Sequence, residues 1–336
     1  MNHYIFTSLT RISDLADKAF EYKYLAKANW ATGDYIVCEV TKSSRQLQAE
    51  LANGRMMELL PGDRLVAALG VRHASLEATG SWHAVGREGK MHLLTGAGLA
   101  GKVTSRSTFI PELIRIDYVG HVMIDQQKCR MSDYAPKIKE LDFNLPVILI
   151  VGTSMSAGKT MAAKVIIRQL KKMNLKVVGG KLTGGGRYRD ILSMKDGGAD
   201  AVFDFVDAGL PSSICSVEQY SEALGKLLSM LASVKADVAV IEIGASPLEP
   251  YNGDIAVKKI QDQVKCTVLC ASDPYAVVGV MQSWRVQPSI ISGPAVNTLG
   301  GIDLIKKLCD IEPLNLIERE NLPRLRTILR ESLQLD

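Results

Sequence analysis

The chain has 336 residues, enough for one large domain or two medium-sized domains with sizeable cores. Hydrophobic residues make up 47% of it and charged residues 23%, the balance of a soluble globular protein. The net charge is only +4 and no dense Lys/Arg block occurs, which argues against a nucleic-acid partner.

The longest apolar runs have the length of a strand, which argues against a membrane span, and the first residues lack a signal-peptide pattern. The six cysteines are scattered and form no Cys-x-x-Cys pair. We therefore expect reduced thiols and a cytoplasmic location.

Residues 1–135 predict a β-rich N-terminal domain with a short leading helix. Apolar residues recur at roughly helical spacing from Ile5 to Tyr22, which predicts that helix. From residue 32 onwards, turn signals such as Gly33-Asp34 and Asn53-Gly54 each precede a short β-like run. Such frequent turns are typical of a small antiparallel barrel or sandwich.

Residues 136–145 predict a linker, and residues 146–336 predict an α/β domain. Strand and helix patterns alternate there, which favours a mostly parallel sheet covered on both faces, with ligands at the carboxyl ends of the strands. The predicted strands are 147–151, 175–181, 237–243, 265–271 and 288–293, and the predicted helices are 158–173, 216–234, 254–263, 274–283, 302–309 and 322–334.

A glycine-rich loop between the first of these strands and its helix predicts a phosphate-binding site. Backbone N–H groups of such a loop and of the following helix N-terminus favour an anion. The Lys159 ammonium can reach the terminal phosphates, and the Thr160 hydroxyl can hold Mg²⁺. Five residues separate the two glycines, where the usual loop has four. The predicted nucleotide-binding residues of the loop are Gly152, Thr153, Ser156, Ala157, Gly158, Lys159 and Thr160.

Three charged residues at or beyond strand ends are further candidates. Glu242 ends the strand 237–243, where a carboxylate can hold Mg²⁺. Lys181 ends the strand 175–181, where a second ammonium would stabilise a transferring phosphoryl group. Asp190 could be a further Mg²⁺ ligand or a base. The predicted catalytic residues are Lys159, Lys181 and Glu242.

Two loops at the same edge predict substrate contacts. In Gly184-Gly-Gly-Arg187-Tyr-Arg189, two arginines could bind a carboxylate or phosphate through paired hydrogen bonds. The same sequence is also compatible with an ordinary surface loop whose charges have no function. The run Ser246-Pro-Leu-Glu249-Pro-Tyr251-Asn252 has two prolines that would hold its polar side chains over the cleft, where an amine would suit them. The predicted substrate residues are Thr183, Arg187, Arg189, Ser246, Glu249, Tyr251 and Asn252.

The loop spacing, with Glu242-Ile-Gly-Ala, resembles dethiobiotin synthetase and its P-loop relatives. In that family a Lys-Pro-x-x-(Ser/Thr)-Gly element faces the substrate, and Lys181-Leu-Thr-Gly is similar to it. Asn297 resembles the asparagine that reads adenine in such proteins. The resemblance also implies a homodimer or a larger homo-oligomer.

The runs Gly184–Asp190 and Glu242–Gly253 resemble a narrower P-loop family, long catalogued as of unknown function, which includes D-glutamate N-acetyltransferases. The resemblance covers about residues 145–310.

Three functions follow as alternatives. The leading hypothesis is an enzyme that uses ATP and Mg²⁺ to phosphorylate a carboxylate or similar oxygen of a small acid or amino acid, and then ligates it to an amine. The second, implied by the narrower family, is N-acyl transfer from acetyl-CoA. The third is a nucleotide-sensing switch without catalysis.

Overall fold

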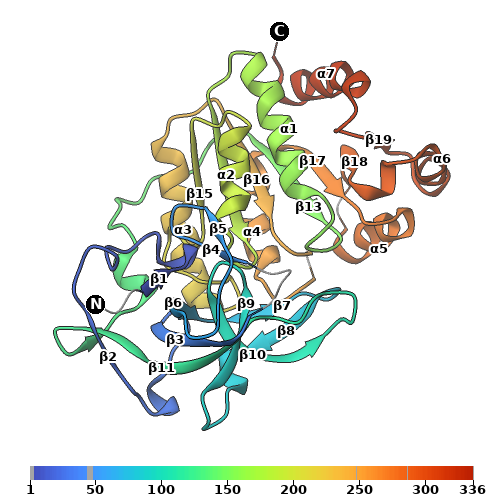
Figure 1. Ribbon diagram of the computed structural model, residues 1–336. Helices are drawn as coiled ribbons and strands as arrows, with labels where there is room; N and C mark the ends of the chain where they lie inside the picture. Colours follow the sequence, from blue (N-terminus) through green and yellow to red (C-terminus); the bar gives the residue numbers. More distant parts are fainter. Residues whose placement is uncertain (1–3, 44–47, 247, 286, 336) are drawn as a thin grey trace. The chain divides into compact units, whose positions relative to one another are not determined.

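The computed structural model describes residues 4–43, 48–246, 248–285 and 287–335 (Figure 1). The chain divides into two compact units. Unit 1 holds residues 1–137, 185–189 and 205–223, and unit 2 holds residues 138–184, 190–204 and 224–336. A single boundary at 136–145 does not describe this division, because two later segments belong to unit 1. Within the described residues, no helix is long and apolar enough to cross a membrane.

Unit 1 is built around strands that close into a ring. Strands β6, β3, β11, β9 and β10 pair in that order, and β10 also pairs with β6, which closes the ring. The pairings are antiparallel except those of β6 with β10 and with β1. The strands are β1 (Tyr4–Phe6), β2 (Glu21–Lys23), β3 (Tyr35–Lys42), β4 (Ala49–Glu50), β5 (Met56–Met57), β6 (Arg64–Leu69), β7 (Val71–His73), β8 (Ala78–Ser81), β9 (Lys90–Thr95), β10 (Leu99–Arg106), β11 (Arg115–Ile124) and β12 (Gln127–Lys128).

The core of unit 1 follows from alternation along these strands. Ile36, Cys38 and Val40 of β3 point to the same side as Leu65 and Ala67 of β6, and all five side chains are buried in one cluster. Short 3₁₀ turns connect the strands: η1 (Ser8–Thr10), η2 (Lys27–Asn29), η3 (Trp82–Ala84) and η4 (Met131–Tyr134).

The predicted leading helix was wrong. Strand β1 and the single 3₁₀ turn η1 occupy the start of that segment, and β2 occupies its end. Leu9 and Leu15 are fully buried, so tertiary contacts satisfy the apolar positions without a helix. Burial of the same side chains against a sheet overrode the local periodicity.

Unit 2 contains a parallel seven-stranded sheet, which confirms the predicted α/β fold with a mostly parallel sheet. The strand order is β15-β14-β16-β13-β17-β18-β19, and every pairing is parallel. The strands are β13 (Val147–Gly152), β14 (Val177–Thr183), β15 (Ala201–Asp204), β16 (Val238–Ile243), β17 (Val264–Cys270), β18 (Ile290–Ser292) and β19 (Glu312–Pro313).

Helices cover both faces of this sheet, as its fully buried strands require. Ile148 and Ile150 of β13 share a buried cluster with α1 and α7. On the opposite face, a Cβ at Gly180 of β14 would lie 3.2 Å from the Leu231 side chain of α3. The helices are α1 (Lys159–Lys172), α2 (Tyr188–Asp196), α3 (Val217–Ser233), α4 (Gly253–Ile260), α5 (Pro274–Trp284), α6 (Leu299–Leu308) and α7 (Leu322–Leu333), with the 3₁₀ turns η5 (Gln261–Gln263), η6 (Pro294–Val296) and η7 (Arg319–Asn321).

We expect trypsin to cut the native protein first after Lys137 or Lys139. Both lysines are exposed, and residues 136–146 form neither helix nor strand. The two fragments should nevertheless elute together in size-exclusion chromatography. Arg11 in the first fragment pairs with Asp207 in the second at 3.0 Å, and both belong to unit 1. Separate elution of the fragments under native conditions would contradict this division of the chain.

Candidate phosphate-binding site

Three charged residues stand in register at the carboxyl edge of the unit 2 sheet. Asp204 of β15 pairs with Lys181 of β14, and Lys181 pairs with Glu242 of β16. Glu242 in turn pairs with Ile150 of β13, two residues before the glycine-rich loop. All three charged side chains are buried. Because burying an unpaired charge is energetically costly, these three side chains need oppositely charged or hydrogen-bonding groups close by.

The glycine-rich loop runs from the end of β13 to the start of α1, as predicted. Gly158 precedes the helix with a φ of +92°, a left-handed conformation that favours glycine. No side chain caps this helix end. The first N–H groups of α1 therefore keep their capacity to bind an anion.

Lys159 lies inside the loop rather than in solvent. Its side chain is 2% exposed, and its ammonium donates to the Ser154 carbonyl at 2.6 Å. The stem crosses Gly152 so closely that a Cβ there would meet Lys159 atoms at 2.9–3.0 Å, which explains the glycine. Burial lowers the pKa of the Lys159 ammonium, and the nearby Glu242 carboxylate partly offsets that shift.

Thr160 and Glu242 meet next to the loop. The Thr160 hydroxyl donates to Glu242 Oε2 at 3.2 Å. Burial raises the pKa of the Glu242 carboxyl; Lys181 and Lys159 lower it and Asp190 raises it. A hydroxyl and a carboxylate at this spacing can both serve as oxygen ligands of one cation.

Asp190 forms an ion pair with Lys181 in the same buried cluster. Burial lowers the pKa of the Lys181 ammonium, but the Asp190 and Glu242 carboxylates outweigh it and raise that pKa. Asp190 therefore serves as the partner of the Lys181 ammonium in this structure, and its role as a Mg²⁺ ligand stays a prediction.

The remaining donor set fits Mg²⁺ and does not fit a metal held by protein alone. Among the described residues, no group of three or more His, Cys, Asp and Glu side chains gathers to hold a metal. Mg²⁺ is usually bound by one or two protein oxygens together with waters and substrate phosphates. Thr160 and Glu242 can supply those two oxygens.

Thr183 and Thr153 stabilise the strand ends. Thr183 is fully buried, and its hydroxyl donates to the Gly244 carbonyl at 3.1 Å. Thr153 Oγ1 accepts from the Ser272 N–H at 3.0 Å, and the Thr153 N–H donates to the Cys270 carbonyl at 3.0 Å. These bonds tie β14 to β16 and β13 to β17. The predicted substrate role of Thr183 stays a prediction; in this structure its hydroxyl is used by the contact between the strand ends.

The predicted substrate loop after β16 is occupied by its own contacts. Glu249 Oε2 accepts from the Ser246 N–H at 2.7 Å, and Tyr251 is fully buried. The Tyr251 side chain has no surface open to solvent, and its substrate role stays a prediction. Asn252 has a φ of +59° and precedes α4, which makes it a turn residue. Pro247, one of the two prolines cited for rigidity, lies outside the described residues.

Sequence reasoning missed a second glycine that shapes the loop. Gly293 has a φ of +88°, and a Cβ there would lie 2.4 Å from the Ala157 carbonyl oxygen. The turn at Gly293-Pro294 therefore lies directly against the phosphate-binding loop. Asn297, the predicted adenine contact, is exposed and follows this turn after η6. In the sequence, the Gly293-Pro294 pair at the end of a buried strand could have indicated this turn.

Arg187 and Arg189 lie in the part of the chain that belongs to unit 1. There the buried Glu50 carboxylate accepts from the backbone N–H groups of Tyr188 at 2.7 Å and Arg189 at 2.8 Å. Glu50 thus provides the anion at the start of α2. Binding of an acidic substrate by Arg187 and Arg189 stays a prediction.

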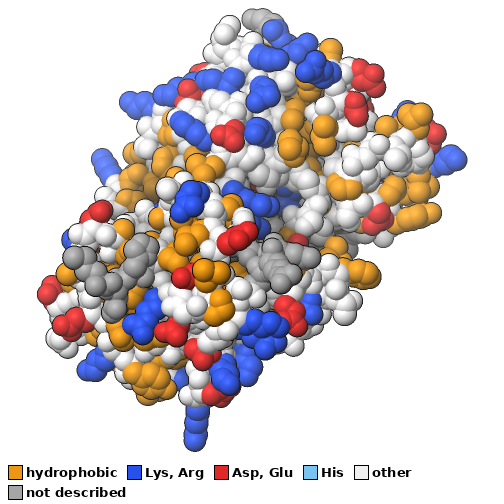
Figure 2. Space-filling view, viewed as in Figure 1, with side chains coloured by type: hydrophobic (Ala, Val, Ile, Leu, Met, Phe, Trp, Pro, Cys, Tyr) orange, Lys and Arg blue, Asp and Glu red, His pale blue; other side chains and the backbone are white. Residues whose placement is uncertain are grey.

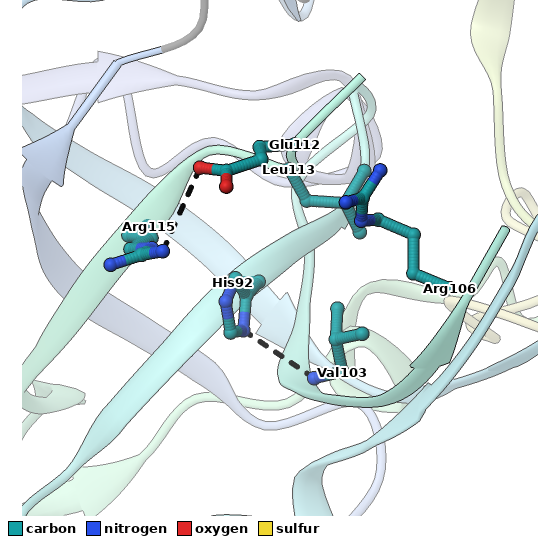
Figure 3. Close-up of a pocket in the computed structure, with 6 residues that line it drawn as sticks. All are labelled: His92, Val103, Arg106, Glu112, Leu113 and Arg115. Atoms are coloured by element: carbon teal, nitrogen blue, oxygen red, sulfur yellow. Dashed lines mark hydrogen bonds and ion pairs between the residues drawn. The ribbon is translucent and has the colours of Figure 1, made fainter. Parts of the chain in front are cut away.

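A small pocket in unit 1 is unrelated to any predicted site residue. Its volume is about 100 Å³. Figure 3 shows that Arg115 pairs with Glu112, at 3.6 Å, and that His92 accepts from the Val103 N–H, at 3.4 Å. Burial, with the nearby Arg115 and Lys102, lowers the pKa of the His92 imidazole. The pocket is lined by His92, Val103, Arg106, Glu112, Leu113 and Arg115.

The solved structures named here are distantly similar to this chain. No family model and no curated protein matches the chain. HypB from Helicobacter pylori, solved with nickel, is 15% identical over 57% of this chain and 88% of its own, with a TM-score of 0.38. The signal recognition particle receptor FtsY from Elizabethkingia anophelis is 15% identical over 60% and 70%, with a TM-score of 0.37. A plasmid partition protein from Borrelia burgdorferi bound to AMPPNP is 16% identical over 57% and 99%, with a TM-score of 0.34.

At these TM-scores the fold assignment rests on this chain's own sheet order and on its strand–loop–helix arrangement. The resemblances to dethiobiotin synthetase and to the D-glutamate N-acetyltransferase family are not shown by these findings.

We expect Glu242→Gln to stabilise the ligand-free protein increasingly as the pH rises. The pKa of the Glu242 carboxyl is raised by folding, so its contribution to stability is fully present below the ordinary value of 4.5. That contribution is lost as the pH rises through the raised value in the folded state. Glutamine keeps an acceptor for Thr160 and carries no charge. For a domain of this size, a difference of about 1 kcal/mol in the free energy of unfolding corresponds to roughly 2–4 °C in Tm.

Thermal unfolding of both proteins at pH values from about 5 to about 8 measures this difference. Glu320→Gln, at an exposed position, is the control and should give a difference in Tm that does not change with pH. A pH-independent difference for Glu242→Gln would contradict the assigned direction of the pKa shift.

Proposed function

We propose that this protein binds a nucleoside triphosphate, ATP in the simplest case, together with Mg²⁺, and transfers its terminal phosphoryl group to an oxygen of a small acid. The observation that carries this proposal is the cluster of Lys159, Thr160, Lys181 and Glu242 at one edge of a parallel sheet. A phosphate loop alone would support binding only. A second buried ammonium beside the carboxylate that meets Thr160 also supports chemistry on the phosphate.

Each residue of the cluster has a distinct part in this proposal. The uncapped end of α1 and the loop would bind the β- and γ-phosphates, and Lys159 would exchange the Ser154 carbonyl for a phosphate oxygen. Thr160 and Glu242 would hold Mg²⁺, which when bound neutralises charge on the phosphates. Lys181, kept protonated by Asp190, would stabilise the negative charge that develops on the transferred group.

The proposal stops at phosphoryl transfer. Subsequent ligation to an amine was predicted from the loop after β16, but the Glu249 carboxylate there accepts a hydrogen bond from its own loop and Tyr251 is buried. No feature of the described residues favours acyl transfer from acetyl-CoA over phosphoryl transfer. Acyl transfer and a non-catalytic switch are therefore outcomes for the activity test.

We expect Lys159→Ala to weaken Mg-nucleotide binding by roughly 100-fold, because a hydrogen bond between charged groups contributes about 3 kcal/mol. Lys172→Ala removes an exposed lysine from the same helix and should leave the affinity unchanged. Isothermal titration calorimetry with ATP and with GTP, each with Mg²⁺, measures both effects. No nucleotide affinity in the wild-type protein, or equal affinity in the Lys159→Ala variant, would refute the assignment of the loop.

We expect phosphate or ADP release from ATP to require both Mg²⁺ and an acidic acceptor. A panel of amino acids and small carboxylic acids is assayed with ATP for phosphate and, separately, with acetyl-CoA for thiol release. Lys181→Met should abolish turnover while nucleotide binding persists, since Met fills a similar volume without the charge. Thiol release without metal would replace the proposal with acyl transfer. Nucleotide binding without either product would favour the switch.

A further inference from the structure

The pocket in unit 1 lies where strand β10 separates from β9. The last residue pair of these two strands is Gly101 with His92, and beyond it β10 pairs with β8 instead. On its other side β9 runs beside β11, where Arg115 is the partner of His92. Residues of the loop between β10 and β11 complete the lining. The pocket is therefore built on the framework of the sheet and not on a loop alone.

The His92 imidazole is held in one tautomer. The Val103 N–H, beyond the last pair of β10 with β9, donates to His92 Nδ1 at 3.4 Å (Figure 3). A neutral imidazole whose Nδ1 accepts a hydrogen bond carries its proton on Nε2. Among the described residues, His92 Nε2 has no hydrogen-bond partner. Because the ring is half-buried in the lining, this N–H is a donor that a ligand could use.

The Arg106 guanidinium is fixed by the loop that follows it. Its Nη1 donates to the Ser107 carbonyl at 3.2 Å and also to the Ile110 carbonyl. Both bonds use the same nitrogen, and within the described part of the chain Nε and Nη2 have no other partner. Since backbone carbonyls already hold the side chain in place, a ligand would lose less entropy in ordering it.

Positive charge is in excess around this pocket. Glu112 is the one carboxylate of the lining, and it is contacted by Lys42 Nζ at 2.7 Å and by Arg115 at 3.6 Å. With Arg106, three cations thus surround a single carboxylate. Figure 2 shows Lys and Arg side chains gathered around β10, in the lower part of the view. A bound dianion would balance this excess.

We propose that this pocket binds a phosphate group, held by Arg106, Arg115 and the Nε2–H of His92. The three donors come from three strands, β10, β11 and β9. A phosphate group presents three oxygens in different directions, whereas a carboxylate presents two in one plane, so this set of donors favours phosphate. The volume of about 100 Å³ admits such a group and excludes a whole nucleotide. The pocket shares no residue with the phosphate-binding loop of unit 2.

Binding should tighten as the pH falls, because His92 then adds a positive charge. The charged groups around its imidazole are Arg115 of β11, Lys102 and Arg106 of β10, and Glu112 of the loop. In the free protein, burial and then Arg115 and Lys102 hold the pKa of His92 below its ordinary value of 6.5, and a bound anion would raise it.

The NMR signal of the His92 imidazole reports on both binding and protonation, and its loss in His92→Gln assigns it. Sulfate is the first probe, since its charge stays constant over the range tested. Its affinity should rise several-fold between about pH 7.5 and about pH 5.5. A His92 signal that does not respond to sulfate, or an affinity that does not change with pH, would overturn the proposal.

We expect Arg115→Gln to weaken sulfate binding at this signal by about tenfold, as the loss of a hydrogen bond to a charged group predicts. Arg55→Gln, at an exposed arginine of unit 1 outside the pocket lining, is the matched control and should bind as the wild type does. Lys159→Ala should also leave the response of His92 unchanged, which separates this pocket from the phosphate-binding loop. Unchanged binding in Arg115→Gln, or loss of the response in Lys159→Ala, would contradict the assignment.

Three further probes identify the group that the pocket accepts. Inorganic phosphate and glycerol phosphate should both shift the His92 signal, and acetate should need at least tenfold higher concentration. Tighter binding of glycerol phosphate than of inorganic phosphate would support a phosphate ester as the occupant, and the reverse order would support the free ion. Acetate binding as tightly as either would overturn the assignment to a phosphate group.

Discussion

The candidate site depends on the balance of buried charges at one edge of a parallel sheet. Two ammonium groups, Lys159 and Lys181, lie among the carboxylates of Asp190, Asp204 and Glu242. Removing the Lys181 ammonium would leave the Asp190 carboxylate without its paired cation in a poorly solvated position, which is costlier than the loss of one contact. The stability of the protein therefore depends on whether the site is occupied, because bound phosphates and a cation would change the electrostatic surroundings of each charged residue.

Glycine determines how closely the backbone can approach this cluster. Gly152 admits the stem of Lys159, Gly293 admits the Ala157 carbonyl, and Gly244 lies so near Thr183 that a Cβ would sit 2.1 Å from its carbonyl oxygen. Three separate strand ends thus need a residue without a side chain at the same edge. The loop is held in shape by its neighbours as much as by its own sequence.

The parts of the fold that local patterns determine were predicted, and the parts that depend on strand order were not. Lys159, Thr160 and Glu242 could be found because a strand, a glycine-rich turn and a helix are adjacent in the sequence. Asp204 could not, since its position beside Lys181 follows from the placement of β15 at the sheet edge. The burial of Tyr251 could not be predicted either, because a single aromatic residue among polar residues is typical of a surface loop.

The composition of unit 1 has a consequence for how the chain folds as it is made. Glu50 needs the backbone of Tyr188 and Arg189, Arg11 needs Asp207, and Gly185 bridges to Ser212. The ribosome must therefore release about the first 220 residues before the N-terminal unit has all of its partners. Until then the Glu50 carboxylate lacks the two N–H donors of that helix start. A nascent chain stopped at the end of β12 would carry the ring of strands without the segments that complete it.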